Sequence, residues 1–185
     1  LSEQIMCHIN HAAALNGVTL SAMTLALASK NTLFRDDLET QLTLLVDLHK
    51  GNALFDTMTL PPEATVKDLV DNALKMEKFV EEKGEQTTIS IAADQVVEMS
   101  YYRNNIIHLY VIPSIIAAIL LEKITVERAH IHKIIQLVAP ILGNEYFFKI
   151  DQAKLTQHID HCINCMQQHQ LLDVQGENIV AVDHA

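Results

Sequence analysis

Apolar residues recur at helical spacing along most of the chain. The pattern is clearest in residues 36–50, where Leu38, Leu42, Leu45 and Val46 fall on one side of a helix and polar residues fall on the other. The same spacing predicts further helices in residues 3–15, 19–29, 66–77, 125–138 and 152–169. A turn or linker is expected in the proline-containing residues 59–65, which read TLPPEAT.

A longer helical pattern covers residues 92–121 and contains the most apolar part of the chain. Pro113 lies inside it, and proline removes a backbone donor, so we expect a bend or break at this residue. The apolar run 106–121 is shorter than the roughly 20 residues of a membrane span and includes His108 and Ser114. It predicts a buried central helix, with an interfacial membrane contact as the alternative.

Two short segments favour β-hairpins. Residues 78–91 place Gly84-Glu85 between β-forming stretches, and residues 171–182 place Gly176 in a second turn. Together with the helices, these turns predict a mainly α fold with short β-hairpins.

The two halves of the chain resemble each other. Gly51 and Gly143 are 92 residues apart, and so are Gly84 and Gly176. The same spacing, with one gap before the last pairs, places Leu42, Leu45 and Val46 on Ile134, Leu137 and Val138, and Ile89 and Ile91 on Val180 and Val182. We therefore expect an internal duplication into residues 1–92 and 93–185, each with the helix, helix and hairpin order of a winged-helix unit. The two repeats together could form one compact domain, and the alternative is a chance alignment of two helical segments.

Charge and composition narrow the possible functions. The 185 residues carry 13 Lys and Arg against 23 Asp and Glu, a formal charge of −10. This balance argues against a nucleic-acid partner, which requires a basic face. Mean hydropathy is +0.15, so we expect some surface to meet a partner or lipid. The chain begins without methionine inside a helical pattern, and we expect it to be a piece of a longer protein.

A polar cluster precedes the apolar run, with the sequence YYRNNIIH at residues 101–108. On a continuous helix, Tyr101, Asn104, Asn105 and His108 share one face. Arg103 lies beside that face, where its planar guanidinium could hold a carboxylate or phosphate. The cluster is either a contact to an anionic ligand or another domain, or a set of polar groups that fix the helix in place.

Histidines and cysteines gather in HIDHCINC, residues 158–165. His158, Cys162 and Cys165 share a helical face, with His161 beside them, and these are residue types that bind zinc. Structural zinc sites draw ligands from two segments, and only an approach of His130 and His132 would supply the second. We expect no metal and no cofactor, and the sequence has no nucleophile elbow, P-loop or dinucleotide motif.

The run YYRNNIIHLYVIPSIIAAILL (101–121) resembles a segment of the membrane-bound bacterial glycerol-3-phosphate acyltransferase family. Residues 8–38, HINHAAALNGVTLSAMTLALASKNTLFRDDL, are similar to the same family just beyond its acyltransferase domain. The resemblance implies acyl transfer from acyl-acyl-carrier protein or acyl-CoA to sn-glycerol 3-phosphate. It also implies a location at the cytoplasmic face of the bacterial inner membrane.

The family's catalytic signature is His-x4-Asp, and no histidine of this chain has an aspartate five residues later. The resemblance therefore implies a non-catalytic C-terminal helical region. Its partners would be its own catalytic domain and, through the parent enzyme, glycerol 3-phosphate and the acyl donor, with a peripheral membrane contact. The candidate contact residues are Tyr101, Tyr102, Arg103, Asn104, Asn105 and His108. A second hypothesis is a non-catalytic adaptor of tandem winged-helix-like units that binds another protein.

Overall fold

A computed structural model describes residues 2–11, 14–55 and 64–182. Two compact units are present. The N-terminal unit comprises Ala12–Val46 and Thr57–His108, and the C-terminal unit comprises Leu1–His11, Asp47–Asp56 and Leu109–Ala185. No helix in the described residues is long and apolar enough to cross a membrane.

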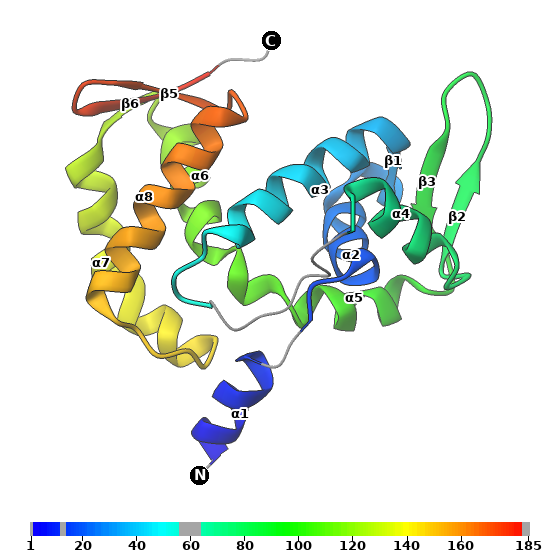
Figure 1. Cartoon of the computed structure of the whole chain (residues 1–185), viewed down its shortest axis with the longest axis horizontal. Helices are drawn as coiled ribbons and strands as arrows, with labels where there is room; N and C mark the ends of the chain where they lie inside the picture. The colour runs from blue at the N-terminus through cyan, green and yellow to red at the C-terminus, as the bar shows by residue number, and fades with distance from the viewer. Residues whose placement is uncertain (1, 12–13, 56–63, 183–185) are drawn as a thin grey trace. The chain divides into compact units, whose positions relative to one another are not determined.

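The N-terminal unit is a group of helices with one three-stranded antiparallel sheet (Figure 1). The strand order is β1-β3-β2. Its elements are α2 (Gly17–Leu27), the 3-10 helix η1 (Ser29–Asn31), β1 (Thr32–Phe34), α3 (Arg35–Lys50), α4 (Val66–Leu74), β2 (Phe79–Glu82), β3 (Thr88–Ile91) and α5 (Val96–Asn104). The 3-10 helix η2 (Ile107–Leu109) follows, and the last turn of α3 belongs to the C-terminal unit.

Local chemistry explains where helices of the N-terminal unit begin. Asn16 and Thr19 form a capping box at the start of α2, and Thr65 and Asp68 form one at the start of α4. Gly17 is required because a Cβ at this position would lie 1.8 Å from the carbonyl oxygen of Leu69. The first turn of α2 therefore packs directly on the backbone of α4.

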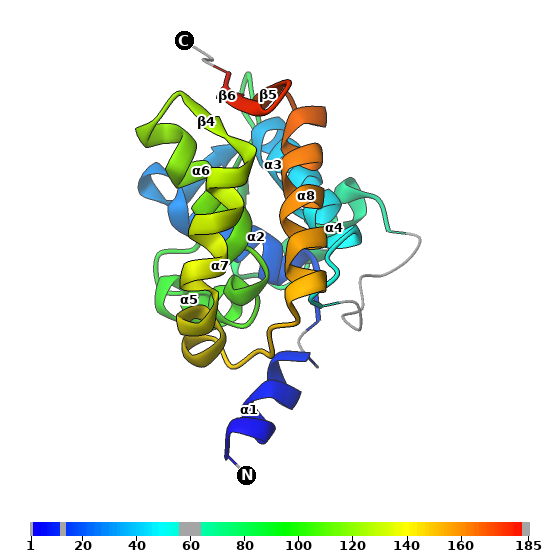
Figure 2. The ribbon, with the colours of Figure 1, turned by 90° about the vertical axis from the view of Figure 1, so that its left-hand side faces the viewer.

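The C-terminal unit has the same kind of architecture. Its elements are α1 (Ser2–His11), α6 (Val111–Glu122), β4 (Thr125–Glu127), α7 (Arg128–Glu145), α8 (Gln152–Gln168), β5 (Leu172–Gln175) and β6 (Asn178–Ala181), with strand order β4-β6-β5. Figure 2 shows α6, α7 and α8 together below the small sheet, and each of these helices contacts the other two. Buried residues such as Ile116, Ile135 and Ile159 form the core between them.

The order of elements occurs twice in the chain. The series α2, β1, α3, α4, β2, β3 is followed by α6, β4, α7, α8, β5, β6. In the first series, the backbone N–H of Arg35 donates to the carbonyl of Thr87 (2.9 Å). In the second series, the backbone N–H of Arg128 donates to the carbonyl of Glu177 (2.8 Å). The mainly α fold with short β-hairpins is thus confirmed, whereas the division at residues 92 and 93 stays a prediction.

The residue pairing predicted between the halves was wrong by one position. The buried residues of α3 are matched by those of α7 at a spacing of 93, with Leu38, Leu42 and Val46 against Ile131, Ile135 and Ala139. Ile89 pairs with Leu33 and Ile179 pairs with Val126, so Ile89 corresponds to Ile179 and not to Val180. A slip of one residue on a strand moves every side chain to the opposite face, which is why the difference matters.

The break in the long helical pattern also differs from the prediction. Helix α5 ends at Asn104 and α6 begins at Val111, so the interruption precedes Pro113. Pro113 is the third residue of α6, where a missing N–H removes no intrahelical bond. Two short strands, β1 and β4, were not predicted, and the predicted linker at 59–65 lies largely outside the described residues.

Candidate interaction site at the end of α5

The polar cluster lies where α5 ends, and it does not form the single helical face that the sequence predicted. Because α5 stops at Asn104, His108 falls in η2 instead of one turn further along the same helix. Tyr101 is 69% exposed, whereas His108 is buried with 4% of its surface accessible. Asn104 and Asn105 are exposed, and Tyr102 and Arg103 are partly exposed. The structure therefore separates His108 from the exposed residues.

The buried members of this segment hold it in place. Met99 on α5 is completely buried, as is Ile106 just beyond the helix. The N–H of Asn105 donates to the carbonyl of Tyr101 (3.1 Å), and the N–H of Ile106 donates to the carbonyl of Arg103 (3.1 Å). These bonds close the end of α5, so the exposed side chains project from a well-defined backbone.

Arg103 is the charged residue of the site. Its Nε and one terminal nitrogen donate to the side-chain oxygen of Asn104, at 3.2 and 3.1 Å. Arg103 lies in the last turn of α5, where a cation interacts favourably with the helix dipole. Arg103 makes no ion pair with any residue that the structure describes.

The other two arginines of the chain are paired with acids. Arg35 contacts Glu39 (2.8 Å), Asp71 (2.5 Å) and Glu81 (3.0 Å), and hydrogen bonds to these carboxylates raise its pKa above the ordinary value. Arg128 contacts Asp160 (2.8 Å). Arg103 therefore differs from both arginines, because its guanidinium N–H groups could donate hydrogen bonds to a carboxylate of another protein or domain.

The histidines and cysteines of α8 form a cluster in the C-terminal unit, in which His158, Cys162 and Cys165 are buried and His161 is partly buried. Burial, followed by the nearby His161 and His49, lowers the pKa of His158 to about 4. Burial also raises the pKa of Cys162, and it raises that of Cys165 to about 11 with a smaller effect from Asp47. Zinc binds thiolates, and these thiols stay protonated at neutral pH in the absence of a metal.

Three members of this cluster have side-chain contacts. The Sγ of Cys162 lies 3.6 Å from Nε2 of His158. Nε2 of His161 is 3.2 Å from the carbonyl oxygens of both Asp47 and Leu48, at the end of α3. Among the described residues, no group of three or more histidine, cysteine, aspartate or glutamate side chains is arranged to hold a metal ion.

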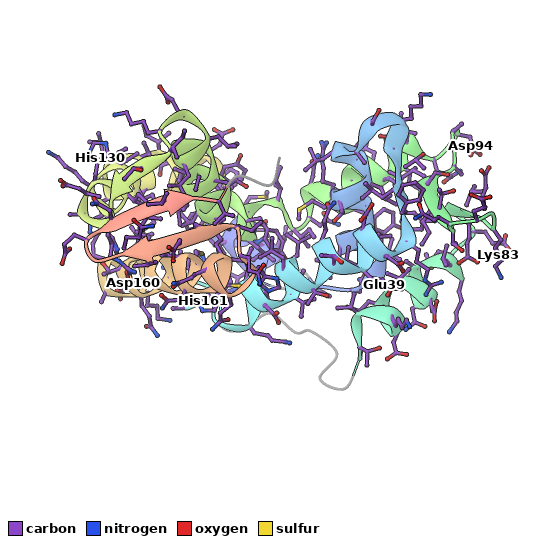
Figure 3. The ribbon with its side chains drawn as sticks, turned by 90° about the horizontal axis from the view of Figure 1, so that it is seen from above. Glu39, Lys83, Asp94, His130, Asp160 and His161 are labelled. Carbon is purple, nitrogen blue, oxygen red and sulfur yellow. The ribbon has the colours of Figure 1, made fainter. Side chains whose placement is uncertain are left out.

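Two histidine–aspartate pairs form between residues far apart in the sequence. Nε2 of His132 is 3.0 Å from Oδ1 of Asp160, which also accepts from Arg128. Nε2 of His169 is 3.1 Å from Oδ2 of Asp47. Asp160 and His161 follow one another on α8 (Figure 3), yet they contact different elements. His132 thus contacts a carboxylate of α8, whereas the side chain of His130 is exposed to solvent.

The Arg35 cluster was not found by sequence reasoning. It joins α3 to α4 and β2, and its member Glu39 is labelled in Figure 3. The sequence feature that could have indicated this cluster is an arginine directly after a short strand in both halves. These arginines are Arg35 and Arg128, which are 93 residues apart. That signal depends on recognising β1 and β4, which are only three residues long.

Comparison with known proteins identifies the relatives of this chain. The family model of the glycerol-3-phosphate acyltransferase C-terminal region matches residues 1–184. A glycerol-3-phosphate acyltransferase of Aeromonas hydrophila is 35% identical over 176 residues, which cover 95% of this chain and 22% of the relative. One of Shewanella amazonensis is 35% identical over 179 residues, which cover 96% and 22%. No solved structure matches.

The chain thus spans about a fifth of the length of the curated relatives that it matches. The match runs through both units and includes the polar cluster at the end of α5. The chain belongs to the family of glycerol-3-phosphate acyltransferase C-terminal regions.

Proposed function

We propose that this chain is the non-catalytic part of an enzyme that transfers a fatty acyl group from acyl-acyl-carrier protein or acyl-CoA to sn-glycerol 3-phosphate. Its work is to support the catalytic domain of the parent enzyme. The contact is made by Tyr101, Tyr102, Arg103, Asn104 and Asn105 at the end of α5. The observation that carries this proposal is the state of Arg103, which has no acidic partner among the described residues although the other two arginines do.

The inward-facing member of the cluster has a different role. His108 is buried, so it supports the backbone from which the exposed residues project. A substitution of His108 would therefore act through the stability of the N-terminal unit. Arg103 and Tyr101 would act through contacts with the neighbouring domain.

The histidine–aspartate pairs of the fold do not supply a better enzymatic hypothesis. A general base needs access to the proton that it removes. Asp160 is shared between His132 and Arg128, whose positive charge competes with the histidine for that carboxylate. His169 binds the carboxylate of Asp47 close to the end of α3, an arrangement that stabilises the C-terminal unit.

We further infer that the two halves are repeats of a winged-helix-like unit, divided near residues 92 and 93. The repeated order of elements and the equal strand orders support this inference. The acidic composition favours protein contact over DNA contact for such units. The resemblance also suggests that the parent acts at the cytoplasmic face of the bacterial inner membrane, with this region as a peripheral part.

The proposal is tested with Arg103→Ala in the full-length parent enzyme. Loss of a charge-assisted contact to the catalytic domain weakens that contact by roughly 1.5–3 kcal/mol. We expect kcat/KM for glycerol 3-phosphate to fall about tenfold. A matched control is Lys83→Ala in the β2–β3 loop, where the side chain is 80% exposed and distant in sequence from the cluster. Equal activity of the Arg103→Ala and Lys83→Ala enzymes would remove Arg103 from the proposed contact.

A further inference from the structure

An apolar pocket of about 260 Å³ lies in the C-terminal unit. It is formed by α6, α8, β5 and β6, and every lining residue is apolar, including Leu121, Met166, Leu171 and Val182. Leu121 is 86% exposed, and Leu171 and Val182 are each 38% exposed. The pocket is therefore an opening in the core, and its rim carries large apolar side chains.

The equivalent position in the N-terminal unit is occupied by α5. There the N–H of Ala92 donates to the carbonyl of Lys78 (3.0 Å), directly beyond the β2–β3 pairing. In the C-terminal unit the N–H of Val182 donates to the carbonyl of Leu171 (3.2 Å), directly beyond the β5–β6 pairing. Leu171 and Val182 thus correspond to Lys78 and Ala92, and both line the pocket.

Helix α5 follows Ala92 and covers the place in the N-terminal unit that corresponds to the pocket. It packs against α2, which precedes β1 as α6 precedes β4. Nζ of Lys78 donates to Oε1 of Gln95 (3.3 Å) and forms an ion pair with Glu98. Met99 of α5 is completely buried. A helix with one apolar residue facing inward therefore completes the N-terminal unit.

Among the described residues, the only helices that line the pocket of the C-terminal unit are α6 and α8, so no described helix takes the place of α5 there. The position of Lys78, which pairs with Glu98, is taken by the uncharged Leu171. An occupant would therefore meet an apolar surface where α5 meets a cation. The volume is below the roughly 300–1,000 Å³ of small-molecule sites, and no polar side chain lines the pocket to orient a ligand.

We propose that this pocket receives the apolar face of an amphipathic helix from the part of the parent enzyme outside residues 1–185. The helix would lie on α6 as α5 lies on α2, with uncharged residues against Leu171. This inference rests on the proposed function, because it requires that the chain works as part of a longer enzyme. It adds a second docking surface, on the C-terminal unit, to the polar one at the end of α5.

A photo-crosslinking experiment on the purified full-length enzyme tests this proposal. The photoreactive residue p-benzoylphenylalanine replaces Leu121, whose high exposure makes the change compatible with folding. After irradiation, we expect mass spectrometry to find one adduct, on an apolar segment with helical periodicity outside residues 1–185. A second substitution, Leu171→Lys, places an unpaired charge in the contact, and we expect it to lower the crosslinking yield about tenfold.

The matched control places the same photoreactive residue at Leu137 on α7, which is 77% exposed in the same unit. This control is expected to give no adduct with that segment. Crosslinks only to detergent or lipid, to residues 1–185, to a second copy distinguished by isotope labelling, or to nothing would overturn the inference. Those outcomes leave the proposed function standing, since the Arg103→Ala kinetics test it separately.

Discussion

The two units join their helices to their sheets by different chemistry. In the N-terminal unit, Arg35 at the start of α3 contacts carboxylates on α3, α4 and β2. In the C-terminal unit, Arg128 at the equivalent position pairs with a single carboxylate of the described residues, that of Asp160. Within that unit, the partly buried His161 of α8 contacts the carbonyls of Asp47 and Leu48, and the buried Cys162 contacts His158. The same order of elements is therefore stabilised by a partly buried arginine–carboxylate cluster in one unit and by histidine and cysteine side chains of α8 in the other.

This difference means that the units should respond differently to mutation, acid and salt. Ion pairs that solvent still reaches contribute little each and are screened by salt. A buried neutral histidine contributes stability that depends on pH. Amide hydrogen exchange measures the stability of each unit separately and can therefore detect these differences.

The largest effect is expected from Gly17→Ala in the N-terminal unit. Its Cβ would meet the carbonyl oxygen of Leu69 at 1.8 Å, and backbone cannot move away cheaply. We expect a destabilisation of about 3 kcal/mol, measured by urea unfolding. Gly84→Ala is the control, because its nearest neighbour would be 3.6 Å away. Similar unfolding midpoints for the two variants would contradict the close packing of α2 on α4.

Acid should destabilise the C-terminal unit through His158. The folded-state pKa of this histidine is about 4 against an ordinary 6.5, because burial disfavours the charged form. Its stabilising contribution is complete above pH 6.5 and is lost as the pH falls towards 4. The difference, 6.5 − 4, corresponds to about 3 kcal/mol.

The measurement is hydrogen exchange of α8 amides in wild type and His158→Gln between pH 7 and 4. We expect the wild type to lose protection steeply and the variant to lose less, since glutamine does not titrate. A wild type and variant with equal pH dependence would show that His158 is not the titrating group.

Gly51→Ala should destabilise the C-terminal unit by a smaller amount than Gly17→Ala. The added Cβ would meet the ring of His161 at 2.1–2.5 Å, but a side chain can move where backbone cannot. We expect about 2 kcal/mol, together with loss of the contacts from His161 to the carbonyls of Asp47 and Leu48. The double variant Gly51→Ala, His161→Ala should recover part of this stability because the clash is removed. No recovery in thermal unfolding would argue against this contact.

Arg35→Ala should destabilise the N-terminal unit by about 1 kcal/mol at low salt, and Arg128→Ala should have a smaller effect on the C-terminal unit. Arg35 loses three carboxylate partners and Arg128 loses one. Raising the salt concentration should reduce both effects, as seen in urea unfolding curves. A larger effect of Arg128→Ala would reverse the comparison between the units.

Periodicity predicted much of this fold because helices and hairpins are local structures. The helix at 36–50 and the hairpins around Gly84 and Gly176 follow from patterns within fewer than 20 residues. The three-residue strands β1 and β4 could not be predicted, since they exist only by pairing with β3 and β6 far along the chain. The one-residue error between the halves has a different origin. Gly84 is the second residue of the β2–β3 loop (83–87), whereas Gly176 is the first residue of the β5–β6 loop (176–177), so aligning the two glycines displaces the pairing by one residue.

The candidate site was predicted only in part. The sequence located YYRNNIIH as a polar cluster, but its helical face depended on a helix that ends at Asn104. The distinction between Arg103 and the paired Arg35 depends on long-range contacts from α3 to α4 and β2, which no local pattern records. The histidine–aspartate pairs were likewise invisible, because His132 and Asp160 are 28 residues apart.

The central claim is that this region contributes a docking surface and no catalytic group. Its most direct test is an acyl-transfer assay with sn-glycerol 3-phosphate and acyl-CoA on purified residues 1–185 beside the full-length parent at equal molar concentration. We expect turnover by the parent and none above background by residues 1–185. Formation of acylated glycerol 3-phosphate by residues 1–185 alone would contradict it.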